Sequence, residues 1–302
     1  MSATTDTTLI AVPNVSEGED AATLEAVGAA FGATPHVRLL APPHADVDHG
    51  RTVFTLAGPP GALAPALLAG ARAAVERIDL ARHHGTHPHV GAVDVVPVVY
   101  LDDERLGAAC AEALVVADLL GHELDLPVFL YGELGGGRTR AELRRGGPAE
   151  LARRLDAGEL RPDFGPPRMH PTAGGVLVAA RPPLVAFNVE LAPPATVEDA
   201  RRIAALIREG GEEGLPGVRA IGLSLPHHGG VSQVSMNVED HTQVPLAEVV
   251  AAIARHARLV EAELVGLAPR AALAGFPDDL PCRNRATLED ALAQARTPRN
   301  NL

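Results

Sequence analysis

Short apolar runs alternate with longer periodic stretches along the first half of the chain. The apolar runs predict strands, which fall at 9–13, 37–40, 53–57, 93–101 and 128–131. Apolar residues that recur every three or four positions predict helices, which fall after Ser16, at 63–80 and at 104–120. The first of these helices is preceded by Ser16 and Glu19, whose spacing matches a capping box. The run 93–101 is almost entirely apolar, which is typical of a strand buried on both faces.

The second half repeats this alternation after a segment of different composition. Residues 135–172 are rich in glycine, proline and arginine and predict a connection with one short helix at 150–155. Strands are then predicted at 184–191, 218–225, 231–238 and 264–267. Helices are predicted after Thr196, which caps the helix together with Asp199, from Pro245 to about 261, and after Thr287.

Both halves therefore follow the order β-α-β-β-α-β, with an additional α-β in the first half. This order is typical of a ferredoxin-like unit, whose helices lie on one side of the sheet and leave the other face uncovered. We expect an α/β (α+β) protein of two such subdomains, 1–180 and 181–302, which bury their uncovered sheet faces against each other. One larger mixed sheet is the alternative.

Composition and charge exclude several classes of function. A formal net charge of −12 argues against a nucleic-acid-binding protein. All 26 basic residues are arginine, so neither a Schiff-base lysine nor a phosphate-loop lysine is present. No run of 18 apolar residues predicts a membrane span, and the first residues lack the pattern of a signal peptide. With only two cysteines, the expectation is a cytoplasmic protein without a disulfide framework.

Four histidines within seven residues make 83–89 the most chemically promising segment. His83 and His87 would share one face of a helix and could bind a metal, but Gly85 and Pro88 interrupt a helix there. The segment could also be a surface loop without a function. In a third interpretation it is a catalytic loop, because Pro88 forces His87 toward an extended conformation that fixes its ring. Asp94 could orient a histidine or bind backbone amides of the loop.

Two other segments hold candidate residues. In 44–51, Asp46 and Asp48 could bind a cation or form a solvated turn, and Arg51 is a candidate anion ligand. The loops at 161–166 and 170–175 are rigid and could line a site or connect two domains.

A series of motifs resembles glutamate formiminotransferase, the transferase part of formiminotransferase-cyclodeaminase. The matching segments run in the same order from about Leu9 to Pro269 and comprise 12–18, 51–55, 78–79, 82–88, 91–95, 127–133, 162–166, 186–189, 233–237 and 264–269. The residues after Pro269 are too few for a cyclodeaminase domain, so the resemblance implies a stand-alone transferase.

The resemblance implies transfer of a formimino group from N-formimino-L-glutamate to N5 of tetrahydrofolate, which is a co-substrate; no metal is expected. It implies facing sheets with a folate tunnel between them, a homodimer, and small-molecule substrates rather than nucleic acid or membrane as partners. The catalytic histidine of the family falls on His87, which would take and return a proton. The candidate substrate-binding residues are Arg51, His89, Asp94, Asp163, Arg181 and Asn188, with Arg51 and Arg181 as anchors for carboxylates.

The sequence departs from the family pattern beside His87. The family usually has glutamate and arginine where Thr86 and His89 stand, and acidic residues where 41–44 reads Ala-Pro-Pro-His. Losing a neighbouring carboxylate would lower the basicity of a histidine. The alternatives are therefore a diverged formimino- or formyltransferase with another donor or acceptor, and a non-catalytic folate-binding paralogue.

Overall fold

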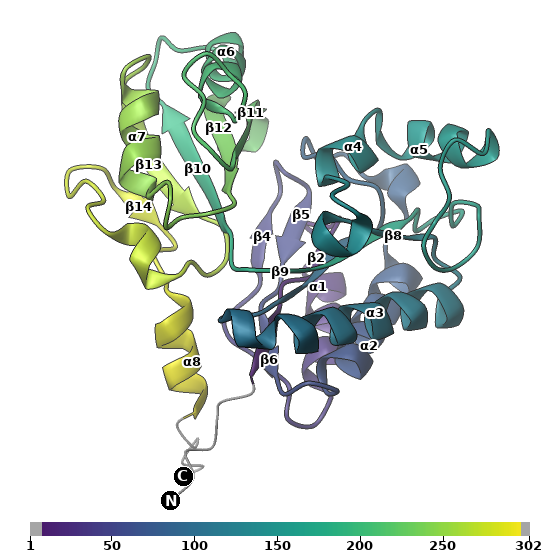
Figure 1. Cartoon of the computed structure of the whole chain (residues 1–302). Coiled ribbons are helices and arrows are strands. Elements are labelled where there is room, and N and C mark those ends of the chain that lie inside the picture. Colours follow the sequence, from purple (N-terminus) through teal and green to yellow (C-terminus); the bar gives the residue numbers. More distant parts are fainter. Residues whose placement is uncertain (1–7, 297–302) are drawn as a thin grey trace, which may run out of the picture. The chain divides into compact units, whose positions relative to one another are not determined.

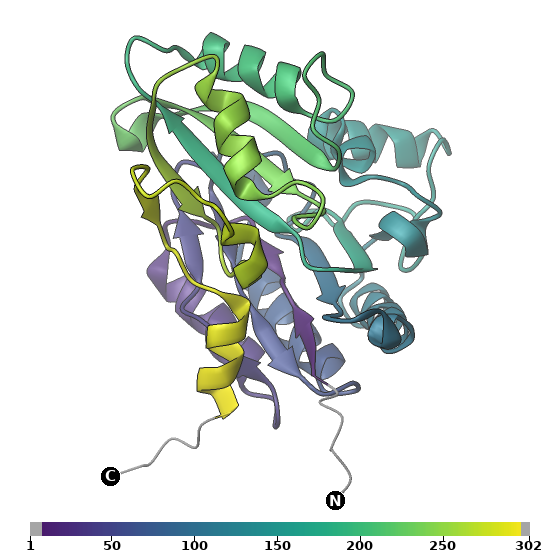
Figure 2. The same cartoon turned by 60° about the vertical axis from the view of Figure 1, so that its left-hand side comes forward.

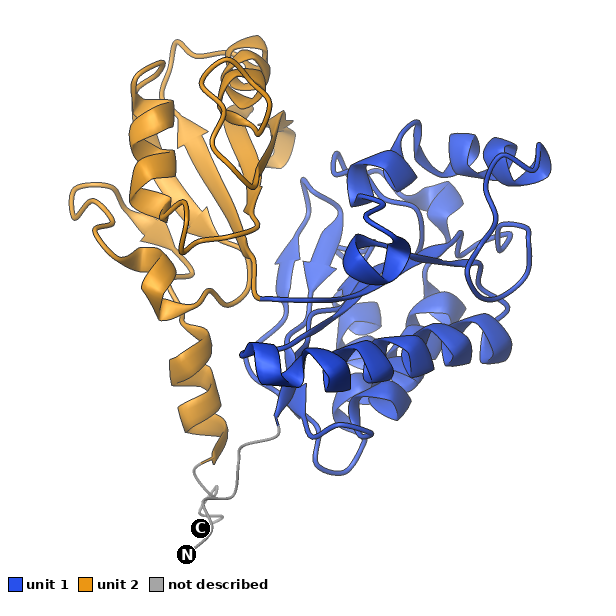
Figure 3. Cartoon of the chain, in the orientation of Figure 1, with its two compact units in different colours: residues 1–182 blue, residues 183–302 orange. Residues whose placement is uncertain are grey.

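The computed structural model describes residues 8–296, which form two compact units (Figure 1, Figure 3). Unit 1 ends at Pro182 and unit 2 begins at Pro183. Each unit has its own sheet, and the main cores of the two units contain different residues. The prediction of a mixed α/β protein with two sheets is confirmed, and the alternative of one larger mixed sheet is wrong.

The sheet of unit 1 is built from strands that are interrupted and continue in line. Its strands are β1 (Leu9–Ala11), β2 (Asn14–Val15), β3 (Arg38–Leu39), β4 (His44–Asp46), β5 (Arg51–Val53), β6 (Leu56–Gly58), β7 (Val93–Val99), β8 (Val128–Leu130) and β9 (Val176–Arg181). On one side, β1 and β2 both pair with β7. On the other side, β1 pairs with β6 and β2 pairs with β5. All four pairings are antiparallel and give the strand order expected of a split βαβ unit. β9 and β8 extend this sheet in parallel beyond β7.

Helices cover both faces of the parallel part of the unit 1 sheet. Three long helices, α1 (Ala21–Gly32), α2 (Leu63–Arg77) and α3 (Leu106–Glu123), share the larger core with the strands. Two short helices, α4 (Arg140–Arg144) and α5 (Gly147–Asp156), contribute Leu143, Leu151 and Leu155 to a second core. Alternate residues of β9 belong to these two cores, as the period of two along a strand requires. The prediction that 93–101 holds a strand buried on both faces is confirmed, since every residue of β7 is buried.

Unit 2 has the same strand order on a smaller scale. Its elements are β10 (Val185–Leu191), α6 (Val197–Ile207), β11 (Val218–Leu225), β12 (Val231–Val238), α7 (Leu246–Ala254), β13 (Leu259–Leu264), β14 (Cys282–Arg283) and α8 (Leu288–Arg296). The order across the sheet is β11-β12-β10-β13-β14, with antiparallel neighbours except for the parallel edge strand β14. The helices α6 and α7 pack on one face of this sheet (Figure 2). Thr196 and Asp199 form the predicted capping box of α6. Single 3₁₀ turns complete the two units at Leu80–Arg82, Asp103–Arg105, Gly132–Gly135, Pro226–His228 and Arg270–Leu273.

The sequence prediction is wrong in three details, and it also lacks the short strand β4 and the short helix α4. Ser16 does not cap α1, because its hydroxyl donates to the Gly91 carbonyl at 2.7 Å and Asp20 caps the helix instead. The sequence predicts no strand at 176–181, where β9 pairs only with strands distant in sequence. The helix predicted to reach 261 ends at Ala254, and the strand predicted at 264–267 runs from Leu259 to Leu264. Apolar positions around 259 fit both periods, and pairing with β10 selects the strand.

The first turn of α2 is capped from a neighbouring helix. Its N-cap residue Ala62 offers no side-chain hydrogen bond. The carboxylate of Glu112 on α3, which is only 5% exposed, instead accepts from the amides of Gly61 and Ala64 at 2.5 and 2.6 Å. An anion at a helix N-terminus is stabilised by the partial positive charge there.

We expect Glu112→Gln to lower the free energy of unfolding by about 1–2 kcal/mol, because the charge is lost and one amide faces an NH₂ group. Chemical denaturation measures this change. Glu123→Gln on the same helix is the control, since Glu123 is 46% exposed and its removal is expected to cost less than about 0.5 kcal/mol. Equal losses in the two variants would contradict the capping role.

Within residues 8–296, no helix is both long enough and apolar enough to cross a membrane.

Candidate active site

Two loops of unit 1 meet at a pair of glycines. Gly50 precedes β5 and Gly85 lies in the histidine-rich loop before β7. A Cβ atom at Gly85 would lie 2.2 Å from the His49 carbonyl oxygen, so only glycine permits this approach. Gly50 has a φ of 61°, a conformation that also favours glycine. The backbone of Thr86 then bonds to the Asp48 carbonyl at 3.0 Å, which fixes the second loop on the first.

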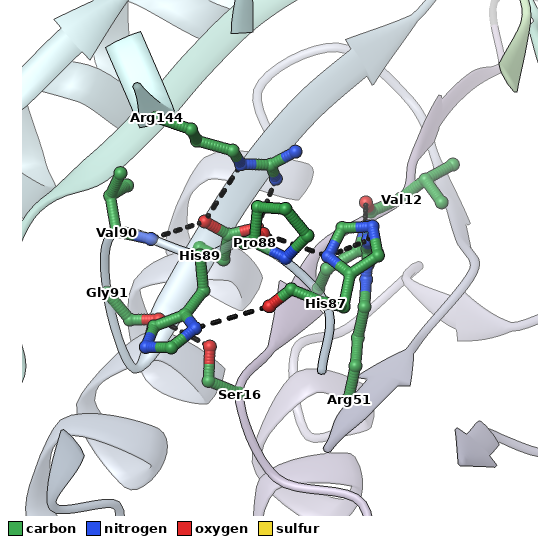
Figure 4. Close-up of polar contacts among 11 residues, drawn as sticks. Val12, Ser16, Arg51, His87, Pro88, His89, Val90, Gly91 and Arg144 are labelled. Atoms are coloured by element: carbon green, nitrogen blue, oxygen red, sulfur yellow. Dashed lines mark hydrogen bonds and ion pairs between the residues drawn. The ribbon is translucent and has the colours of Figure 1, made fainter. Parts of the chain in front are cut away.

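This packing brings Arg51 and His87 into direct contact, as Figure 4 shows. The Arg51 Nη1 atom lies 2.6 Å from His87 Nε2 and 3.0 Å from His87 Nδ1. His87 Nδ1 also lies 2.8 Å from the Pro88 carbonyl oxygen. A carbonyl can only accept, so Nδ1 must carry the proton and donate to it. His87 Nε2 is then the nitrogen with the lone pair, and Arg51 Nη1, within 3.0 Å of both ring nitrogens, lies beside the ring rather than in line with that lone pair.

The charges around His87 keep its imidazole neutral. Burial, and then the positive charges of Arg51 and Arg144, hold the pKa of His87 well below its ordinary value of 6.5. The pKa of Arg51 is lowered to about 9 by burial and by the neighbouring Arg144, although the carboxylate of Asp94 acts in the opposite direction. Arg51 thus remains protonated at neutral pH beside an imidazole that is not.

Asp94 forms a buried ion pair with Arg144. Asp94 lies on β7 and Arg144 at the end of α4, and their side chains are 2% and 10% exposed. Asp94 Oδ1 also accepts from the Val90 amide at 2.9 Å, so the same carboxylate fixes the end of the histidine-rich loop. The sequence suggested that Asp94 either orients a histidine or bonds to backbone amides of the loop. Among residues 8–296, its hydrogen bonds are with the Val90 amide and Arg144, and none is with a histidine.

His89, in the same loop, contacts His87 directly. His89 Nδ1 lies 3.3 Å from the His87 carbonyl oxygen, and its ring makes an edge contact with His83 at 4.2 Å between centroids. Burial and the charge of His89 lower the pKa of His83. On the other side, the ring of His49 lies 6.2 Å from that of His87. Among the described residues, no group of three or more histidine, cysteine, aspartate or glutamate side chains is arranged to hold a metal ion.

Asp46 holds His49 through two contacts. Asp46 Oδ1 accepts from the His49 amide at 2.8 Å, and Asp46 Oδ2 lies 2.9 Å from His49 Nδ1. Burial raises the pKa of Asp46, but the hydrogen bonds and the charge of His49 outweigh it and lower the pKa to about 2.

This lowered pKa predicts a pH-dependent contribution to stability. A carboxylate whose pKa is lower in the folded state stabilises the fold above its unfolded pKa, and this stabilisation is lost as the pH falls toward 2. We expect Asp46→Asn to reduce the free energy of unfolding by about 1–2 kcal/mol at pH 5 and by progressively less toward pH 3. Urea denaturation at several pH values tests this, and a difference that stays constant with pH would contradict it.

The other three candidate residues lie outside this group of contacts. Asp163 accepts from the Leu130 amide at 2.7 Å and pairs with Arg138 at 2.6 Å. Arg181 ends β9 and donates to the Pro182 carbonyl at 2.9 Å. Asn188 belongs to unit 2, where it is buried and donates to Glu263 at 3.1 Å.

Two residues that hold the site were not singled out by the sequence. Asn14 Oδ1 accepts from Arg51 Nε at 2.8 Å and also from Arg51 Nη2. The second residue is Arg144, which pairs with Asp94. It lies in a segment rich in arginine, where nothing in the local pattern distinguishes it from its neighbours. For Asn14, membership of the matching motif 12–18 is the one feature of the sequence that points to the site.

Family models match nearly the whole described chain. The formiminotransferase domain, N-terminal subdomain, matches residues 8–181, and the formiminotransferase domain matches residues 186–277. The chain belongs to the formiminotransferase family. The resemblance inferred from the ordered motifs is thus confirmed, and the contacts of His87 lie within the N-terminal subdomain of this family.

Named relatives in the formiminotransferase family are of two lengths. The chain is 35% identical over 270 residues to the glutamate formimidoyltransferase of Streptococcus pyogenes serotype M1, covering 87% of the chain and 89% of that protein. It is 32% identical over 272 residues to the glutamate formimidoyltransferase of Thermoplasma acidophilum, covering 87% and 88%. It is 38% identical over 279 residues to the formimidoyltransferase-cyclodeaminase of Gallus gallus, covering 87% of the chain but only 50% of that longer protein.

Proposed function

We propose that this protein transfers a formimino group from N-formimino-L-glutamate to N5 of tetrahydrofolate. Family membership and the names of relatives of similar length support the reaction. The observation that carries the proposal for the site is the state of His87: a neutral imidazole with its proton fixed on Nδ1 and its lone pair on Nε2. This is the form that a general base requires.

His87 would move one proton during the reaction. As N5 of tetrahydrofolate attacks the formimino carbon, the N5–C bond forms and His87 Nε2 accepts the N5 proton. The bond between that carbon and the glutamate nitrogen then breaks, and the imidazolium returns the proton to the departing nitrogen. Because Arg51 and Arg144 destabilise the imidazolium, the protonated His87 is a strong acid toward this nitrogen. The proton is conserved, and no additional reactant is needed.

Arginine side chains would hold the carboxylates of the substrates. Arg51 touches His87, so an anion bound to it would place the reacting group beside the base. We assign Asp94 a positioning role, since its carboxylate already bonds to Arg144 and to the Val90 amide. The proposed substrate contacts of His89, Asp163, Arg181 and Asn188 stay predictions, as do the homodimer, the facing sheets and the cytoplasmic location.

Turnover of N-formimino-L-glutamate with tetrahydrofolate by the purified protein tests the function, followed by the absorbance of the folate product. We expect turnover in the wild type and its loss in a His87 variant. Absence of turnover with a protein that still binds tetrahydrofolate would overturn the proposed donor.

A second candidate is a related transferase with another donor or acceptor. The observation that favours it is Thr86, which stands where the family usually has a carboxylate and whose hydroxyl donates to the Asp48 carbonyl at 2.9 Å. This position therefore holds the loop and supplies no charge beside His87. Turnover with another formimino or formyl donor, in the absence of turnover with N-formimino-L-glutamate, would support this candidate.

A further inference from the structure

We propose that His49, oriented by Asp46, selects a formimino donor over a formyl donor by accepting a hydrogen bond from the formimino nitrogen. This inference rests on the proposed function. It goes further because it assigns the choice of the transferred group to a residue other than His87, and it separates the two candidate functions described above.

The first step is the tautomer of His49. Its Nδ1 atom lies 2.9 Å from Oδ2 of Asp46, and Oδ1 of the same carboxylate accepts from the His49 backbone amide. The pKa of Asp46 is lowered to about 2, so this group is an anion at neutral pH. A carboxylate beside Nδ1 draws the imidazole proton to that nitrogen. In the neutral ring, Nε2 then has the lone pair and can only accept.

The second step is the lack of a partner at Nε2. His49 is 6% exposed, and its Nε2 atom has no hydrogen-bond partner among residues 8–296. The two ring nitrogens point in different directions, so the Asp46 carboxylate beside Nδ1 does not serve Nε2. Buried polar atoms are almost always hydrogen-bonded, because leaving one without a partner costs free energy. A buried acceptor of this kind fits a ligand that brings an N–H group.

The third step is the position of His49 beside the proposed base. The rings of His49 and His87 have centroids 6.2 Å apart, and the His87 amide bonds to the His49 carbonyl at 3.4 Å. The close approach of Gly50 and Gly85 holds the two loops together. In the proposed reaction, N5 and the terminal formimino nitrogen are bonded to the same carbon. The separation of the rings matches one such carbon with its two nitrogens hydrogen-bonded to the two imidazoles.

The charges around the two histidines favour the same arrangement. A formimino group is an amidine, which is a strong base and is therefore a cation with N–H groups at neutral pH. The guanidinium groups of Arg51 and Arg144 act on His87 and would repel this cation. Asp46 supplies a negative charge behind His49, which makes Nε2 a better acceptor for it. A formyl group is neutral and its oxygen can only accept, so it gains nothing from Nε2.

The test compares the binding of N-formimino-L-glutamate and N-formyl-L-glutamate by calorimetry in the presence of folic acid. The two compounds have the same carboxylates, and N5 of the oxidised folic acid has no hydrogen, so no transfer occurs. We expect wild type to bind the formimino compound about 10–100-fold more tightly, as one hydrogen bond to a charged group would give. His49→Leu should bind both compounds equally. His49→Gln, whose amide oxygen can accept, should keep part of the preference.

His84→Leu is the matched control. His84 is exposed in the histidine-rich loop, so this variant should retain the wild-type preference. A second measurement needs no variant to fold: the ¹⁵N NMR signal of His49 Nε2 in wild type should shift when the formimino compound binds, and much less with the formyl compound. Equal affinities in wild type, a preference that survives His49→Leu, or an unchanged signal would each overturn the proposal.

The binding measurements do not depend on turnover, so the two proposals can fail separately. A preference for the formimino compound without turnover in the presence of tetrahydrofolate would contradict the proposed function and leave the role of His49 intact. Turnover of N-formimino-L-glutamate by a protein without this preference would contradict the role of His49 alone. Tighter binding of the formyl compound would overturn the role of His49 and favour the second candidate function.

Discussion

Replacing His87 by alanine is expected to lower kcat for formimino transfer by a factor of about 10²–10⁴, the usual contribution of a positioned general acid–base group. In the proposed reaction, His87 Nε2 both takes the N5 proton and returns it to the departing nitrogen. The KM values are expected to change much less, because the proposed anchors of the substrate carboxylates are arginines. Steady-state rates with purified wild type and variant measure the effect.

His84→Ala is the matched control for this prediction. His84 lies in the same loop and is exposed, so its removal should change kcat by less than about threefold, while circular dichroism verifies that both variants fold. The pH dependence gives a second readout. Since the pKa of His87 is well below 6.5 in the free protein, kcat/KM should stay constant as the pH falls to 6.5 and decline only below it. A His87→Ala variant with wild-type kcat would exclude His87 as the catalytic base.

Replacing Arg144 by methionine is expected to lower the free energy of unfolding by about 3–5 kcal/mol, the cost of leaving one partner of a buried ion pair alone. Asp94 would be the uncompensated charge, 2% exposed within β7, and the Val90 amide would be its remaining hydrogen-bond partner among residues 8–296. Because Arg144 also contributes to the low pKa of His87, the same variant should raise that pKa. Denaturation in urea measures the loss of stability, and an NMR titration of the His87 ring measures its pKa.

The control for the Arg144 variant is a substitution of an exposed arginine. Arg168→Met removes a guanidinium that is 64% exposed from an ion pair with Asp125, and such pairs contribute at most about 1 kcal/mol. A double variant, Arg144→Met with Asp94→Asn, should recover part of the lost stability because no buried charge remains. If Arg144→Met were no less stable than Arg168→Met, the ion pair would not be a structural requirement of the site.

Local patterns determined much of the fold from the sequence alone. The apolar run at 93–101 predicted the buried strand β7, and Thr196 with Asp199 predicted the start of α6. These predictions succeeded because residue period and capping depend on neighbours within a few positions along the chain. The ordered motifs likewise identified the family, and Pro88 marked His87 as a residue with a fixed conformation.

The tertiary structure decided what depends on residues far apart in sequence. Ser16 has the spacing of a helix cap, yet its hydroxyl bonds to Gly91, 75 positions away. β9 forms because β7 and β8 pair with it. Arg144 becomes part of the site because it pairs with Asp94, 50 positions away. The sequence indicated both Arg51 and His87 as candidates, but only the close approach of Gly50 and Gly85 places the guanidinium against the imidazole. A contact of this kind has no local signature, because it requires two loops to pack before either side chain can reach the other.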